Sequence, residues 1–383
     1  MVAAMDAKPG FYEFFAGGGM ARAGLGDRWE CLFANDIDPK KGAAYAANWG
    51  AAALHVGDVV RVAADQLPGR ADLVWASFPC QDLSLAGAGA GLAGERSGVF
   101  WPFWRLMTAL ADTGRKPRAI VLENVCGLIT SHGGADFAAL CRAVAAAGYG
   151  VGALVVDAQL FVPQSRPRLF AIATDLDESA PASTSAYAVD QWHPMRLRQA
   201  QAALPEQIRR HWRWYAPAAP VPRTIGLIDV VEERPADVAW HDAATTARLL
   251  AMMSPVNRMK VDAMAASSGS AVGTVYKRTR IEQGRKVQRA EVRFDMAGCL
   301  RTPAGGSSRQ TIITVEGGRV RSRLMSARET ARLMGLGDDY RLPSRYSEAY
   351  HLTGDGVAVP VVRHLARTIL EPMLMRRSAS VPV

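Results

Sequence analysis

The first half of the chain alternates short apolar runs with longer stretches in which apolar residues recur at helical spacing. Strands are predicted at Phe11–Phe15, Trp29–Asn35, Asp72–Ser77, Ala119–Glu123, Val151–Asp157 and Arg168–Thr174. Helices are predicted at Asp38–Asn48, Val99–Asp112 and Ala135–Ala147. This alternation predicts an α/β fold on a doubly wound, Rossmann-like, mostly parallel sheet. The last two strands have no helix between them, so we expect them to form an antiparallel hairpin.

The pattern changes after Thr174. Residues 175–185 are polar and rich in Pro, Ser and Thr, which is typical of a linker. We therefore predict a first domain at 1–185, followed by a smaller, irregular, β-rich domain at 186–345. A helix at Ser326–Met334 opens with a capping-box spacing. Val357–Leu370 is apolar at helical spacing, and we expect the C-terminal segment at 346–383 to return to the first domain.

Charge is distributed unevenly along the 383 residues, whose formal net charge is +9. Residues 1–172 hold 15 basic and 15 acidic residues, whereas 191–325 hold 22 basic and 11 acidic ones, most densely at 276–289. Of the 45 basic residues 38 are arginines, whose planar guanidinium suits phosphates and guanine edges. A neutral half joined to a basic half predicts a catalytic domain followed by a domain that binds a polyanion.

The sequence contains no run of 18 apolar residues and no signal-peptide pattern. We therefore expect a cytoplasmic protein without membrane contact. Its five cysteines follow neither a zinc-binding nor a disulfide-framework spacing, which predicts a reducing compartment and no bound metal.

Residues that follow the predicted strands are candidates for ligand binding, because such sheets bind ligands beyond the carboxyl ends of their strands. The first strand leads into Phe15-Ala-Gly-Gly-Gly19, a glycine turn suited to a carboxylate or phosphate. Asp36, after the second strand, suits ribose hydroxyls, and Asp58, after the third, suits an adenine amino group. Together they predict a cofactor that carries adenosine. The glycines do not follow the dinucleotide-binding spacing G-x-G-x-x-G, which argues against nicotinamide and flavin enzymes.

Two further strand ends carry reactive side chains. In Ser77-Phe-Pro-Cys-Gln81, Cys80 precedes a glycine- and alanine-rich loop and is a candidate nucleophile. In Glu123-Asn-Val125, the apolar strand should keep the Glu123 carboxyl partly protonated and able to donate a proton. The remaining cysteines are predicted to be small buried hydrophobes: Cys31, Cys126, Cys141 and Cys299.

These residues resemble the motifs of the DNA (cytosine-5)-methyltransferase family over nearly the whole chain outside the middle domain. Phe15–Gly19 resembles the first cofactor motif, Phe78–Gln81 the nucleophile motif and Glu123–Val125 the acid motif. Gln164-Ser-Arg-Pro-Arg168 resembles the Gln-x-Arg-x-Arg motif. Two later segments resemble the last two motifs of the family: Glu329-Thr-Ala-Arg-Leu-Met-Gly335 and Gly354-Asp-Gly-Val-Ala-Val-Pro360.

The resemblance implies transfer of a methyl group from S-adenosylmethionine to carbon 5 of a cytosine flipped out of duplex DNA. It implies that Cys80 adds to carbon 6 and that Glu123 protonates ring nitrogen 3. Arg166 would stabilise the base and the developing charge, with Arg168 as a supporting or phosphate-binding group. Asn124 would orient its neighbours. Gln81 begins a stretch that is a candidate for filling the gap left by the flipped base.

The resemblance also implies where the cofactor binds. S-adenosylmethionine would contact Phe15, Ala16, Gly17, Gly19, Asp36, Ile37, Asp58, Val59, Pro79, Val99, Asp355 and Gly356. Two positions depart from the family pattern: Asp355 replaces the usual asparagine, and Ile37 stands where an aromatic residue is also common.

Double-stranded DNA is the implied partner of the basic domain, which would be the target-recognition domain. The first candidates for phosphate and base contacts are Arg278, Arg280, Arg285, Arg289, Ser307, Ser308 and Arg309. We expect a nucleoid-associated monomer that is either solitary or accompanied by a cognate restriction endonuclease. Two alternatives are an RNA (tRNA) cytosine-5 methyltransferase on the same catalytic domain, and a catalytically silent DNA-binding regulator.

Overall fold

The computed structural model of the protein describes residues 8–79, 97–267, 269–302 and 308–374. The chain forms two compact units. The first unit comprises residues 1–156, 167–220 and 357–383, and the second comprises 157–166 and 221–356.

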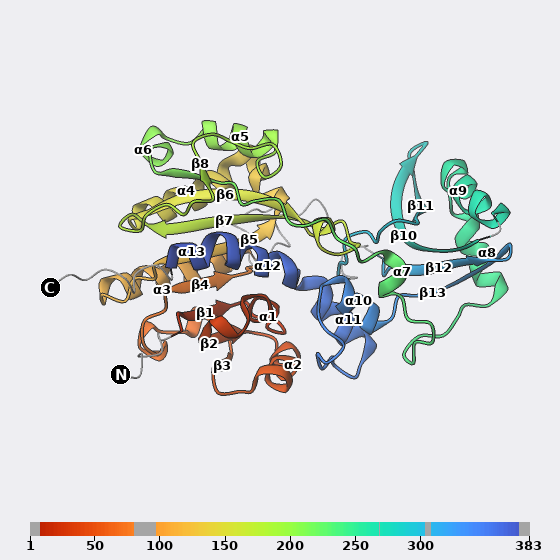
Figure 1. The fold of residues 1–383 in the computed structure, drawn as a ribbon, viewed down its shortest axis with the longest axis horizontal. Coiled ribbons are helices and arrows are strands. Elements are labelled where there is room, and N and C mark those ends of the chain that lie inside the picture. Colours follow the sequence, from red (N-terminus) through yellow and green to blue (C-terminus); the bar gives the residue numbers. More distant parts are fainter. Residues whose placement is uncertain (1–7, 80–96, 268, 303–307, 375–383) are drawn as a thin grey trace. The chain divides into compact units, whose positions relative to one another are not determined.

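A nine-stranded sheet forms the centre of the first unit (Figure 1). Its strands are β1 Gly10–Phe14, β2 Glu30–Asp36, β3 Leu54–Val56, β4 Leu73–Ala76, β5 Ala119–Val125, β6 Tyr149–Asp157, β7 Pro167–Asp175, β8 Thr184–Ser185 and β9 Trp212–Tyr215. Their spatial order is β3-β2-β1-β4-β5-β7-β6-β9-β8. Strands β1 to β5 are parallel, and β7 is antiparallel to β5. Strand order changes direction between β1 and β4, and such switch points bind ligands.

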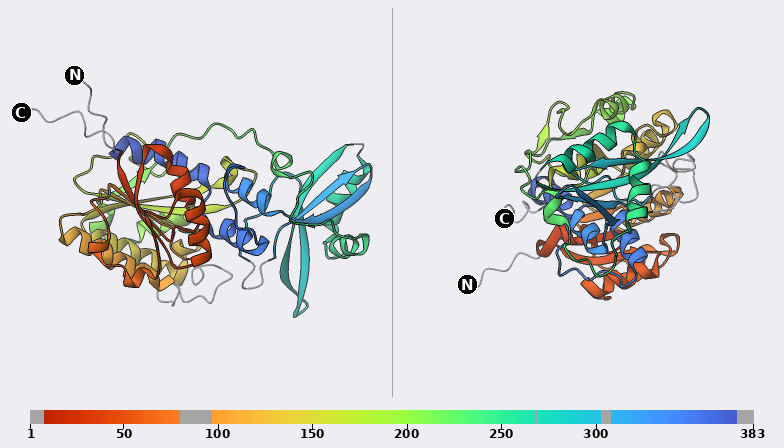
Figure 2. Two further views of the ribbon diagram at one scale, coloured as in Figure 1. Left: turned by 90° about the horizontal axis from the view of Figure 1, so that it is seen from below. Right: turned by 90° about the vertical axis from the view of Figure 1, so that its right-hand side faces the viewer.

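Helices cover both faces of this sheet (Figure 2). They are α1 Met20–Leu25, α2 Pro39–Trp49, α3 Phe100–Asp112, α4 Ala135–Ala146, α5 Met195–Ala202, α6 Glu206–Arg209, α12 Val359–Leu365 and α13 Glu371–Leu374. Helix α12 packs closely on α1: a side chain added at Gly24 would come within 2.4 Å of the Val362 Cβ. The predicted α/β fold is thus confirmed, and residues 357–383 belong to the first unit.

A four-stranded antiparallel sheet and five helices make up the described part of the second unit. The strands are β10 Ser270–Glu282, β11 Arg285–Arg293, β12 Thr311–Glu316 and β13 Arg319–Leu324. The helices are α7 Leu227–Val230, α8 Ala243–Ala251, α9 Pro255–Ala266, α10 Ala327–Leu333 and α11 Tyr346–Asp355. Ser326 and Glu329 form the predicted capping box on α10. The unit is more helical than predicted, since α8 and α9 cover an apolar cluster on β10 and β11.

The unit boundaries differ from the predicted ones at 185 and 345. Residues 186–220 belong to the first unit because β9 hydrogen-bonds to β6 at the edge of its sheet. The second unit extends to 356 because α11 packs on α10. Among the described residues, no helix is long and apolar enough to cross a membrane.

Glu13 is the one acidic residue of β1, and only 1% of it is exposed. Its carboxylate accepts a hydrogen bond from the Arg22 amide of α1 at 3.3 Å. Burial raises its pKa from the ordinary 4.5 to about 8, although the Arg22 amide and charge act in the opposite direction. The folded state therefore holds a proton on Glu13 at pH values where the unfolded chain has lost it.

We predict that Glu13 makes the protein less stable as pH rises from about 5 to 8, by at most about 1.4 kcal/mol per pH unit. The contribution of Glu13 to the free energy of unfolding is fully present below pH 4.5. It is lost as the pH rises through the pKa of about 8 that Glu13 has in the folded state. Glu13→Gln should remove this component. Urea unfolding of both proteins across this pH range measures it, and identical pH slopes would contradict the prediction.

Candidate active site

The glycine turn after β1 is held by carboxylates and by close packing. Phe15, Gly17 and Gly19 have φ angles of +57°, +56° and +77°, in the left-handed region. A side chain at Gly19 would come within 2.4 Å of the Trp49 ring, whereas no atom lies within 4 Å of the corresponding position at Gly17. The turn is therefore tight on one side and open on the other, as a ligand-binding turn requires.

Asp36 connects the end of β2 to this turn. One carboxylate oxygen accepts a hydrogen bond from the Gly17 amide at 2.7 Å, and the other accepts from the Asp38 amide at 2.8 Å. Burial raises the pKa of Asp36, while both amide hydrogen bonds lower it. Each oxygen has a second lone pair, so the carboxylate still has acceptor capacity for a hydroxyl.

The predicted adenine-binding residues differ in accessibility. Ile37 is 66% exposed, which leaves an apolar surface beside Asp36. Asp58 caps the helical turn Val59–Arg61 by accepting from the Val60 amide at 3.0 Å. The side chain of Val59 is buried in the core, so only its backbone remains for a ligand contact. Val99 and Phe15 pack partly against the same core.

Asn124 joins the end of β5 to the end of β4. Its amide nitrogen donates to the Phe78 carbonyl at 3.1 Å, and its oxygen accepts from the Val125 amide at 2.8 Å. Phe78 is buried and Pro79 follows it. Cys80 and Gln81 come next in the sequence and lie outside the described residues. Asn124 thus bonds to the backbone two residues before Cys80, and its predicted orienting role stays a prediction.

Glu123 lies beside a guanidinium. Arg168 Nε is 3.3 Å from its Oε1, and the two side chains are only 15% and 8% exposed. In the ladder of β5 and β7, Arg168 pairs with Val125, so Glu123 is its diagonal neighbour on the same face. The Glu123 carboxyl is thus largely buried beside a charged partner, and its role as proton donor stays a prediction.

Arg166 occupies a different environment, inside the second unit. Its Nη1 donates to the Leu300 carbonyl at 2.8 Å, and its Nη2 to the carbonyls of Gly354 and Gly356 at 2.9 and 2.7 Å. Only 2% of the residue is exposed. The sequence predicts Arg166 on the base and Arg168 in support. The structure brings Arg168 to the acid and Arg166 to backbone carbonyls, and the role of each in the reaction stays a prediction.

The rest of this motif and the last motif form one hydrogen-bonded cluster within the second unit. The Gln164 amide is fully buried, donates to the Leu333 carbonyl at 2.8 Å and accepts from the Leu300 amide at 3.0 Å. Asp355 accepts a hydrogen bond from the Thr302 hydroxyl. The contact of Asp355 and Gly356 with a cofactor stays a prediction.

The predicted DNA-binding residues belong to β10, β11 and the segment before β12. Arg278 and Arg280 pair with Glu291, and Arg289 pairs with Glu282. Ser308 bonds to the backbone of Lys277, and Arg309 lies over the ring of Tyr346 at 5.1 Å. Ser307 lies outside the described residues.

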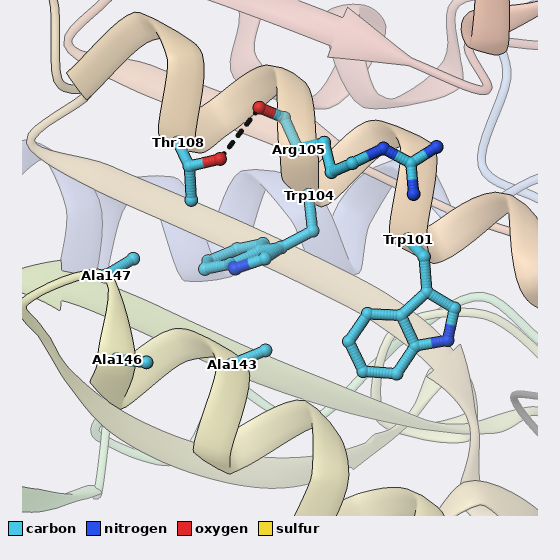
Figure 3. A pocket seen from close by; sticks show the side chains of 7 residues that line it. All are labelled: Trp101, Trp104, Arg105, Thr108, Ala143, Ala146 and Ala147. Atoms are coloured by element: carbon cyan, nitrogen blue, oxygen red, sulfur yellow. Dashed lines mark hydrogen bonds between the residues drawn. The ribbon is translucent and has the colours of Figure 1, made fainter. Parts of the chain in front are cut away.

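An apolar hollow of about 320 Å³ lies between α3 and α4 (Figure 3). It is lined by Trp101, Trp104, Arg105, Thr108, Ala143, Ala146 and Ala147. None of these residues was predicted to bind the cofactor. The lining carries no acidic group for ribose hydroxyls or an ammonium, so the strand ends stay the candidate cofactor site.

Sequence reasoning missed two contributions to the site. Glu13, which holds the amide of Arg22, was not singled out, although a single acid in an apolar strand is a usable signal. The contact between Arg168 and Glu123 was also missed. The alternation of side chains between the two faces of β7 could have indicated this contact, but only if the register of β7 against β5 had been known.

Comparison with known proteins identifies the family. The model of the family described as C-5 cytosine-specific DNA methylase matches residues 10–371. The type II methyltransferase M.NlaX of Neisseria lactamica is 26% identical over 364 residues, which cover 92% of this chain and 94% of that enzyme. M.BsuFI of Bacillus subtilis is 33% identical over 161 residues, which cover 42% of this chain and only 37% of that enzyme.

Solved structures share the fold at low sequence identity. The Dnmt2 methyltransferase of S. pombe superimposes with a TM-score of 0.57 at 17% identity, covering 95% of this chain and 99% of that one. A putative DNA modification methyltransferase of an E. coli prophage gives 0.54 at 16% identity, with 94% and 97% covered. Since the family model spans the strand ends, the Gln-x-Arg-x-Arg segment and the last motif alike, this chain belongs to the C-5 cytosine-specific DNA methylases.

Proposed function

We propose that this chain is an S-adenosylmethionine-dependent DNA cytosine-5 methyltransferase with Cys80 as its nucleophile. The observation that carries the proposal is the hydrogen bond from Asn124 to the Phe78 carbonyl, at 3.1 Å. It ties the acid-bearing end of β5 to the chain two residues before Cys80. Glu123 and Arg168 lie at the same end of the sheet and form an ion pair there.

The residues at the switch point fit S-adenosylmethionine. Asp36 has acceptor capacity for ribose hydroxyls, Ile37 offers exposed apolar surface for a ring, and the space beside Gly17 is open. Phe15, Asp58, the backbone of Val59, Pro79 and Val99 are the further proposed contacts. The cofactor, when bound, supplies an electrophilic methyl group to carbon 5.

In the proposed reaction the Cys80 thiolate adds to carbon 6 of the flipped cytosine, and electron density moves toward ring nitrogen 3. Glu123 gives its proton to that nitrogen, which makes carbon 5 nucleophilic. Arg168 then stabilises the carboxylate that Glu123 has become. After methylation, a base removes the carbon 5 proton and the Cys80 thiolate leaves carbon 6. The proton on ring nitrogen 3 returns to Glu123, which restores the aromatic ring and the enzyme.

Duplex DNA is proposed as the substrate rather than RNA because the matching family model is one of DNA methylases. The second unit supports this choice, since it carries 22 basic and 16 acidic residues. A basic surface of this kind binds phosphates along a duplex.

The first prediction from the proposed function concerns Cys80. On duplex DNA with 5-fluorocytosine at the target position, the wild-type protein plus S-adenosylmethionine should form a covalent adduct, because fluorine at carbon 5 blocks expulsion of the thiolate. Cys80→Ala should form none. Denaturing gel electrophoresis detects the adduct, and adduct formation by both proteins would refute the assignment.

The second prediction separates the two arginines. Arg168→Gln should lower kcat by about 10²-fold or more, because Glu123 loses its charged partner, while stability changes little. Arg166→Gln should instead lower the free energy of unfolding by about 3 kcal/mol, because buried carbonyls lose a charged donor. Single-turnover rates and urea unfolding measure the two effects. If Arg168→Gln keeps wild-type kcat, Arg168 has no role in the reaction.

The third prediction concerns Asp36. Asp36→Asn should weaken binding of S-adenosylmethionine roughly tenfold, because a charged acceptor for ribose hydroxyls is lost. Asp38→Asn is the matched control: it removes the same charge two residues away, where the Asp38 carboxylate caps α2. Isothermal titration calorimetry compares the two variants, and equal affinities would argue against a ribose contact.

A further inference from the structure

Strands β10 and β11 extend beyond the rest of their sheet (Figure 2). Strand β12 pairs with β10 only over Ser270–Val275. The pairing of β10 with β11 continues from Tyr276 opposite Glu291 to Glu282 opposite Arg285. These seven residue pairs have no third strand beside them in the described sheet. We call residues 276–291 the distal ribbon.

The distal ribbon carries most of the net positive charge of the second unit. Its 16 residues include six basic and two acidic ones, against 22 and 16 in the whole unit. The register places Arg278 opposite Arg289, and Arg280 two residues further along the same face. Arg285 continues that face at the turn. All four predicted DNA-binding arginines of β10 and β11 therefore lie on one face of the ribbon.

One carboxylate organises two of these arginines. Glu291 accepts from Arg280 Nη2 at 2.6 Å, and its second oxygen lies 3.8 Å from Arg278 Nε and accepts from the Tyr276 hydroxyl. The Arg278 guanidinium also lies 4.8 Å from the centre of the Tyr276 ring. About half of each arginine side chain stays exposed, at 49% and 51%. Both guanidinium groups are thus oriented without being buried.

The dimensions of the ribbon match a groove of duplex DNA. Seven residue pairs at about 3.3 Å rise extend about 20 Å, and the strands are about 4.8 Å apart. The major groove of B-DNA is about 12 Å wide and admits a two-stranded ribbon. The corresponding groove of duplex RNA is too narrow and deep for such an insertion.

We propose that the distal ribbon inserts into the major groove of the target DNA, and that Glu291 positions Arg278 and Arg280 to bind guanine edges. This inference rests on the proposed function, which makes duplex DNA the substrate. Arg285 contacts phosphate, because it lies at the turn and projects from the end of the same face. Glu291 is a positioning residue: it contributes to sequence discrimination through the two arginines.

The test begins with bisulfite sequencing of DNA from a host that expresses the chain, which gives the methylated sequence. Wild type, Glu291→Gln, Arg285→Gln and Arg319→Gln are then compared on a duplex carrying that sequence. Each guanine in turn is replaced by 7-deazaguanine, which lacks the N7 acceptor that faces the major groove. Arg319→Gln is the matched control, since it removes one exposed charge at the turn between β12 and β13.

We expect 7-deazaguanine at one or more positions to weaken wild-type binding about tenfold. Glu291→Gln should remove this sensitivity even though it makes the ribbon more positive. Arg285→Gln should weaken binding to all duplexes equally and reduce the slope of log affinity against log salt by about 0.9. Arg319→Gln should change neither quantity, and thermal unfolding should show all variants folded.

Three outcomes would overturn the inference while wild type still methylates DNA. These are unchanged 7-deazaguanine sensitivity in Glu291→Gln, equal salt slopes in Arg285→Gln and Arg319→Gln, or equally tight binding of an RNA duplex of the same sequence. Absence of any methylated cytosine in the host DNA would instead contradict the proposed function, and the inference with it.

Discussion

The antiparallel pairing of β5 with β7 is the interaction on which the candidate active site depends. The parallel strands place the glycine turn, Pro79 and Glu123 at one edge of the sheet, because their carboxyl ends coincide. A further parallel strand would bring only its last residues there. Since β7 runs in the opposite direction, its first residues reach that edge, and Arg168 meets Glu123 across the ladder.

Buried polar side chains bond to backbone groups at the end of α11 and in the irregular segment around Leu300 of the second unit. The carbonyls of Leu300, Gly354 and Gly356 accept from Arg166, and the amide of Leu300 donates to Gln164. Buried backbone groups without partners cost about as much as a lost hydrogen bond each. Two side chains from residues 157–166 therefore stabilise two segments that are far apart in the sequence.

The net charge predicts a polyanion as the partner, but the ion pairs determine how the guanidinium groups are oriented. Three of the four predicted DNA-binding arginines on the ribbon are paired with Glu282 or Glu291. Such exposed pairs contribute little to stability. Their effect is to restrict where each guanidinium points, and that favours recognition of an ordered surface over diffuse attraction to phosphate.

The sequence by itself determined the alternation of strands and helices between residues 10 and 175, the glycine turn, the carboxylate after β2 and the family motifs. These are local properties, set by hydrophobic periodicity and by residue types at strand ends. Tertiary structure decided the rest. Strand β5 continues past the predicted end at Glu123 because Asn124 and Val125 pair with Leu169 and Arg168. The contacts of Arg166 and Arg168, two residues apart, depend on strand register and on which carbonyls lie nearby, and neither property is encoded in local sequence.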